Sequence, residues 1–147
     1  KKNIYYWEKV APNSEQYYLS LTILAHLYRE MNRYNESLSL YKTCLKSESS
    51  FTGAHLLWQI YFNIASVYTQ LGKYDFAEEN FHKSLRYVQE CPVSQRDQIW
   101  CVTMANFAIM YYYKSTPDSM RKYAEMLYEV LEIMENKKIY DLNCRER

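Results

Sequence analysis

Apolar side chains in the middle of the chain recur at helical spacing on both sides of Gly72. Before this glycine, four residues at the spacing i, i+3, i+4, i+7 share one face of a helix: Tyr61, Ile64, Ala65 and Tyr68. After it, the small Ala77 and the large Phe81 lie one helical turn apart. Because glycine readily takes the positive φ that ends a helix, the segment predicts two antiparallel helices. The alanines mark the place where these helices cross closely.

The same pattern occurs earlier in the chain. Residues 23–45 repeat the pattern of residues 63–85 at an offset of 40, so that Ala25 falls on Ala65. Internal repeats of this length are typical of solenoids, in which each helix pair buries its apolar face against its neighbours.

A third copy begins near Asn106, at an offset of 43 residues from the second copy. Its second half returns as Ala124-x-x-x-Tyr128, which requires four inserted residues near the sequence KSTPDSM. Four residues form about one helical turn, so we expect a longer helix or loop there.

Boundary signals divide the chain into helices. Asn13 with Gln16, and Ser94 with Asp97, resemble N-cap pairs, and Thr116 precedes a proline suited to the first helical position. The predicted helices are 14–31, 34–48, 54–71, 74–91, 95–114 and 118–135. The repeats then span 13–51, 52–92 and 93–136. Residues 1–12 are interpreted as the tail of a preceding helix and 137–147 as a linker or the start of a next one, so the array is expected to continue at both ends.

These residues resemble the tetratricopeptide repeat, whose pattern is W-x2-L-G-x2-Y, A-x3-F and P. The second copy fits this pattern as Tyr61-x2-Ile64-Ala65-x2-Tyr68 followed by Ala77-x3-Phe81. The ordinary repeat has 34 residues, so this chain resembles a long-repeat variant. The resemblance implies an all-α fold, a right-handed superhelix of about three helical hairpins with partial flanking helices. In that family the first helices line a concave groove that binds peptides or partner segments.

Composition agrees with an all-helical chain and excludes several functions. Only 2 glycines and 3 prolines are present, and the 17 tyrosines suit packing between helices. Net charge is +1 with no basic run longer than two residues, so neither nucleic acid nor an anionic membrane is an expected partner. No apolar stretch approaches the roughly 20 residues that span a bilayer. We expect an intracellular protein, cytoplasmic or nuclear.

No residue pattern predicts catalysis, a metal or another cofactor. His26, His55 and His82 form no metal-binding motif, and a glycine-rich phosphate loop is absent. The cysteines form no CxxC pair, and Cys44 matches a core position, so we interpret it as packing. The sequence therefore predicts a protein that is not an enzyme and takes no small-molecule substrate.

The resemblance places the candidate partner-binding residues on the first helices. They are His26, Arg29, Phe62, Asn63, Ser66, Thr69, Asn106, Tyr112 and Tyr113, with Thr22, Ile23, Ala105 and Ile109 beside them. Asn63 and Asn106 occupy the position at which many family members use an asparagine to hydrogen-bond a ligand backbone. A side-chain amide both donates and accepts, which suits a peptide bond.

The leading interpretation is a protein–protein interaction scaffold. One alternative is a peptide-sensing regulator, whose effector domain would lie outside these residues. The other is a structural subunit that buries its repeats within a large assembly. An exposed apolar convex face would favour that last alternative.

Overall fold

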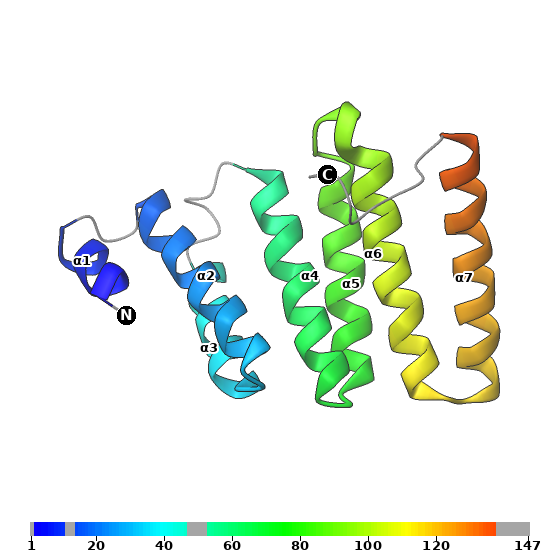
Figure 1. The fold of residues 1–147 in the computed structure, drawn as a ribbon, viewed down its shortest axis with the longest axis horizontal. Coiled ribbons are helices and arrows are strands. Elements are labelled where there is room, and N and C mark those ends of the chain that lie inside the picture. Colours follow the sequence, from blue (N-terminus) through cyan, green and yellow to red (C-terminus); the bar gives the residue numbers. More distant parts are fainter. Residues whose placement is uncertain (1, 11–13, 47–52, 138–147) are drawn as a thin grey trace.

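The computed structural model describes residues 2–10, 14–46 and 53–137, and every regular element within these ranges is an α-helix. The helices are α1 (Lys2–Val10), α2 (Glu15–Glu30), α3 (Tyr34–Leu45), α4 (Ala54–Gln70), α5 (Tyr74–Val88), α6 (Val93–Lys114) and α7 (Pro117–Asn136). Figure 1 shows them as a row that begins at α1 and ends at α7. The predicted all-α class is therefore confirmed.

Consecutive helices pack as three antiparallel hairpins, α2 with α3, α4 with α5, and α6 with α7. Packing of α5 against α6 and of α3 against α4 joins neighbouring hairpins into one array. The predicted end at residue 48 lies outside the described residues, and each other helix end agrees with its prediction to within three residues. Helix α1 contacts α2.

The three hairpins turn in the same way. Asn32, Gly72 and Ser115 have positive φ values of 59°, 72° and 55°, and they follow the first helix of each pair at the repeat offsets. After the first two, the next backbone N–H returns to a carbonyl of the first helix, from Arg33 to Tyr28 (2.8 Å) and from Lys73 to Tyr68 (2.9 Å). These bonds cap the helix carbonyls that would otherwise lack a partner. The three turns lie along one edge of the array (Figure 1).

Small residues allow the two helices of each pair to approach closely. Ala25, Ala65 and Ala108 of the first helices are fully buried, and so are Ser37 and Ala77 of the second helices. Between α2 and α3 the approach brings the Ser37 hydroxyl within 2.6 Å of the Ala25 carbonyl, to which it donates. The predicted crossing points are confirmed.

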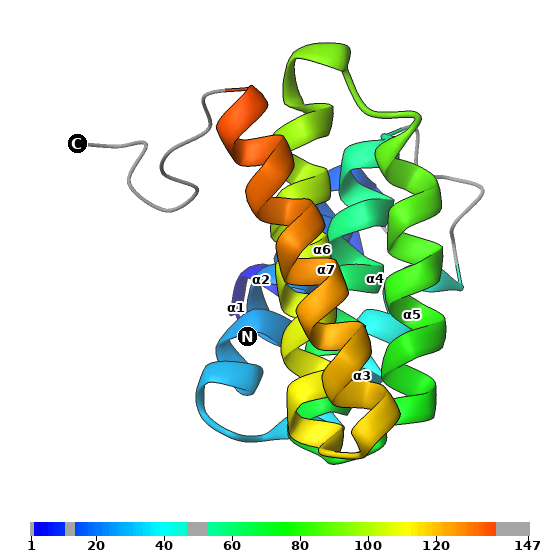
Figure 2. The ribbon, with the colours of Figure 1, turned by 90° about the vertical axis from the view of Figure 1, so that its right-hand side faces the viewer.

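The predicted register of the last helix is wrong. Tyr128 is 74% exposed and Ala124 is exposed, whereas Ser119 is buried and Tyr123 packs against the core. A two-residue connection separates α6 from α7, so no insertion occurs there; Figure 2 shows this tight turn at the lower end of α7. The motif was assigned by residue type, but a serine takes the small position here, as Ser37 does in the first hairpin.

Capping explains where α7 begins. The Thr116 hydroxyl accepts from the Ser119 backbone N–H (3.1 Å) and the Ser119 hydroxyl accepts from the Thr116 N–H (2.7 Å), a reciprocal capping box. The predicted Thr116 cap is thus confirmed. At α2 the cap is Ser14, whose hydroxyl accepts from Tyr17, while the predicted Asn13 lies outside the described residues. Ser94 is not a cap, because α6 begins at Val93.

Candidate binding groove

Two adjoining hollows cross the first helices α2, α4 and α6. The larger has a volume of about 400 Å³ and the smaller about 240 Å³. The larger is lined by Arg29, Glu30, Asn32, Tyr34, Phe62, Ser66, Gln70 and Asn106. The smaller is lined by Ser66, Thr69, Gln70, Phe81, Asn106, Ile109 and Tyr113. Because three residues line both hollows, we treat them as one groove, named here the first-helix groove.

Six of the nine candidate residues line this groove: Arg29, Phe62, Ser66, Thr69, Asn106 and Tyr113. The other three, His26, Asn63 and Tyr112, line neither hollow. Of the neighbouring residues named with them, Ile109 lines the smaller hollow, whereas Thr22 is buried and donates to the Tyr18 carbonyl. Ile23 and Ala105 lie outside both hollows.

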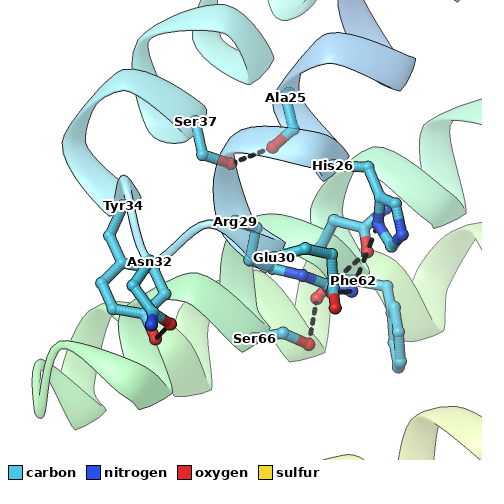
Figure 3. Close-up of polar contacts among 10 residues, drawn as sticks. Ala25, His26, Arg29, Glu30, Asn32, Tyr34, Ser37, Phe62 and Ser66 are labelled. Carbon is cyan, nitrogen blue, oxygen red and sulfur yellow. Dashed lines mark hydrogen bonds and ion pairs between the residues drawn. The ribbon is translucent and has the colours of Figure 1, made fainter.

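Arg29 is held in place by neighbours on two helices. Its Nη1 donates to the Asn63 Oδ1 of α4 at 2.8 Å, and its Nη2 lies 3.3 Å from both His26 Nδ1 and Glu30 Oε1. Figure 3 shows the guanidinium between His26 and Glu30, beside Phe62 and Ser66 of α4. The ion pair with Glu30 offsets the positive charge, so this end of the groove is close to neutral.

Asn63 is buried beneath Arg29. It is only 7% exposed, and its carbonyl oxygen is occupied by Arg29. The reason is the approach of α2 to α4, which covers this position of α4. Its Oδ1 holds the Arg29 guanidinium, and the expected contact of Asn63 with a ligand backbone stays a prediction.

Asn106, at the equivalent position of α6, is placed differently. It is half-buried and lines both hollows, and its Nδ2 donates to the Val102 carbonyl at 2.8 Å. Its Oδ1 has no hydrogen-bond partner among the described residues, so it is able to accept from a ligand N–H. The hydroxyl hydrogens of Ser66 and Thr69 are donated to carbonyls of their own helix, at 3.0 and 2.9 Å. Their oxygens also face the groove as acceptors.

Several groove residues were missed by the sequence analysis. Asn32 belongs to the α2–α3 turn and Tyr34 begins α3, and the Tyr34 hydroxyl donates to Asn32 Oδ1 at 2.9 Å. No pattern on the first helices indicates that this turn reaches the groove. Gln70 was detectable, since it lies one turn after Ser66 on the same face of α4. Phe81 contributes from the second helix, as part of the buried floor.

The buried thiols of Cys44 and Cys101 do not have the lowered pKa of a catalytic cysteine. Burial raises the pKa of the Cys44 thiol to about 11 and that of the Cys101 thiol to about 11. Both thiols are protonated at neutral pH, which is the opposite of an activated nucleophile. Cys44 is fully buried, as expected for a packing residue.

Within the described ranges, no group of three or more histidine, cysteine, aspartate or glutamate side chains is arranged to hold a metal ion. None of the described helices is long and apolar enough to cross a membrane.

Comparison with known families decides what this array is. The family model described as tetratricopeptide repeat matches residues 16–90, which contain α2 except for its first residue and all of α3 to α5, and cover just over half of the chain. The chain belongs to the tetratricopeptide repeat family. Comparison with curated proteins gives no match. The α6–α7 hairpin lies beyond the matched residues but repeats the positive-φ turn and the buried alanine. Tetratricopeptide repeats are typically protein-interaction domains without a catalytic centre, so the family indicates protein partners.

Proposed function

We propose that this protein is a non-enzymatic scaffold that binds an extended segment of a partner protein in the first-helix groove. The observation that carries the proposal is the continuity of the two hollows over α2, α4 and α6. A ligand lying there would contact all three hairpins at once. Membership of the tetratricopeptide repeat family supports a protein as the partner.

The groove dimensions suggest the length of the bound segment. Packed helices lie roughly 8–10 Å apart, so the distance from α2 to α6 across α4 is about 20 Å. An extended chain advances about 3.3 Å per residue, and about six residues would therefore span the groove.

The lining suggests the chemistry of that segment. Gln70 and Asn106 supply amides, and the one ion pair, between Arg29 and Glu30, leaves little net charge. Phe62 and Tyr113 offer aromatic surface beside them. These groups favour a segment that is recognised through its peptide groups, with one or two apolar side chains.

Selection from a displayed library of random peptides on the immobilised chain would supply ligands for the test. We expect the selected peptides to lose about tenfold or more in affinity for the Asn106→Ala/Gln70→Ala variant, because two neutral hydrogen bonds contribute roughly 0.5–1.5 kcal/mol each. The matched control is Gln59→Ala/Gln89→Ala, which removes two exposed amides outside the groove. Equal affinities for both double variants would place the binding surface elsewhere.

A structural role is the second candidate, because apolar side chains are exposed at both ends of the described array. Ile23 and Leu27 of α2 are 54% and 51% exposed, and Leu131 of α7 is 62% exposed. Burial of these faces against neighbouring subunits would suit a large assembly. In that case the chain would self-associate or bind another subunit, and the groove variants would do so as well as the wild type.

A further inference from the structure

A separate hollow of about 420 Å³ lies between α3 and the α4–α5 turn. It is lined by Asn35, Leu38, Ser39, Lys42, Thr43, Lys46, Tyr68 and Lys73. It has no lining residue in common with the first-helix groove. We name it the lysine hollow, because three of its eight lining residues are lysines and none carries a carboxylate.

The three lysines are not neutralised by any acid that the structure describes. No ion pair joins Lys42, Lys46 or Lys73 to a carboxylate of the described residues, and the Lys42 Nζ instead lies 5.8 Å from the ring centre of Tyr68. Among the described acids, Glu36 pairs with Arg33 and Asp75 pairs with Lys114, whereas Glu48 lies outside the described residues. The lysine hollow therefore presents three exposed positive charges.

The lysines of this hollow are only partly repeated in the second hairpin. At the offset of 40 residues, Leu38 and Ser39 correspond to Glu78 and Glu79, and Lys42 corresponds to His82. Lys46 corresponds to Arg86, so the equivalent face of α5 carries both acids and bases, whereas the lining of the hollow beside α3 carries no acid. Because the fold tolerates acids here, helix packing does not explain three unpaired like charges around one hollow.

We propose that the lysine hollow binds an acidic segment of a partner protein, as a contact surface additional to the first-helix groove. Lys42 lies on α3 and Lys46 caps its C-terminal end four residues later, and Lys73 lines the same hollow from the α4–α5 turn. Lysine acts as a point charge on a flexible stem, so three separated lysines suit a row of carboxylates. A single phosphate is better matched by the convergent donors of arginine. The amide of Asn35 and the hydroxyl of Ser39 line the hollow as polar partners for peptide groups.

The probe for the test is fluorescein-labelled hexaglutamate, titrated into the whole chain and followed by fluorescence anisotropy. Lys42→Gln/Lys46→Gln/Lys73→Gln is compared with the control Lys83→Gln/Lys114→Gln/Lys137→Gln. Both variants remove three positive charges, but the control lysines already pair with Glu79, Asp75 and Asp97 at 2.7, 3.6 and 3.7 Å.

We expect the hollow variant to lose about tenfold or more in affinity, the control to change less than about twofold, and added salt to weaken wild-type binding. Equal losses in the two variants would overturn the proposal, because binding would then depend on net charge alone. The proposal would also be overturned if hexaglutamate failed to bind at millimolar concentration. It would likewise be overturned if inorganic phosphate, and not hexaglutamate, bound to the chain through these lysines. If the triple variant does not fold, Lys73→Gln alone replaces it. Hexaglutamate binding that persists in Asn106→Ala/Gln70→Ala separates this surface from the groove.

Discussion

Replacement of Ala65 by leucine tests the helix crossing on which the array is built. Ala65 is fully buried at the crossing of α4 and α5, where Ala77 is also fully buried. Three added carbon atoms have no space there, so either the helices separate or neighbouring side chains leave their preferred rotamers. Leucine and alanine have similar helix propensities, and the change therefore acts through packing.

The expected loss follows from the cost of overpacking. Insertion of extra methylene groups into a packed core costs about 1–3 kcal/mol. For a chain of this size each kcal/mol lowers the melting temperature by roughly 2–4 °C, so a fall of roughly 2–12 °C is expected. Thermal unfolding followed by far-UV circular dichroism measures it, and the native spectrum should be dominated by helix.

Ser66→Leu is the matched control, one residue further along α4. Ser66 is half-buried and lines the groove, so a leucine there has room, and a change below about 0.5 kcal/mol is expected. Equal melting temperatures for the two variants would show that Ala65 is not at a close crossing.

Three further predictions follow from single contacts. Tyr41→Phe should stabilise the fold by about 1–2 kcal/mol, because this buried hydroxyl has no hydrogen-bond partner among the described residues. Tyr111→Phe should destabilise the fold by a similar amount, since the Tyr111 hydroxyl donates to the Glu78 carboxylate at 2.5 Å. Urea unfolding measures both changes, and a change in stability of the same sign for the two variants would contradict this reasoning. Arg29→Ala and Asn63→Ala should each weaken binding of a selected peptide, and the double variant should add little in titration calorimetry, because the amide acts through the guanidinium. Additive losses would mean that the two side chains act separately. Burial raises the Cys44 pKa from 9.0 to about 11, so its contribution to stability is complete below pH 9 and lost as the pH rises through about 11. Urea midpoints for wild type and Cys44→Ala that fall equally over this range would exclude that thiol as a cause.

The hairpins could be predicted from the sequence because their determinants are local. The residue pattern from Ala65 to Ala77 determines the buried faces of α4 and α5 and the position of the turn between them. Gly72 takes the positive φ that this turn requires. Asn32 and Ser115 take the same conformation without being glycine, and only the repeat offset reveals their equivalence.

The α7 register could not be predicted by matching residue types. Ala124 and Tyr128 have the spacing of the family motif, yet both face outward. What decides the register is the capping box of Thr116 and Ser119, which starts the helix directly after a two-residue turn. Ser119 then occupies the small core position, and Tyr123 follows it one turn later.

The candidate site was predicted in part for a similar reason. The resemblance to the family placed Ser66 and Asn106 on the face of the first helices that lines the two hollows. It could not distinguish Asn106 from Asn63, because the difference arises from the packing of α2 on α4 and from the bond to Arg29. Tyr34 is the first residue of α3, a second helix whose direction depends on tertiary contacts.

Photo-cross-linking from two tyrosine positions tests the proposed groove most directly. Benzoylphenylalanine, a photoreactive aromatic residue, would replace either Tyr113, which lines the smaller hollow, or Tyr128, which is exposed on α7 outside it. Each protein is irradiated with the same selected peptide, and the cross-linked product is measured by mass spectrometry. Binding in the first-helix groove predicts cross-linking from position 113 and not from position 128. Cross-linking from position 128 alone would contradict it and place the partner on the outer face of α7.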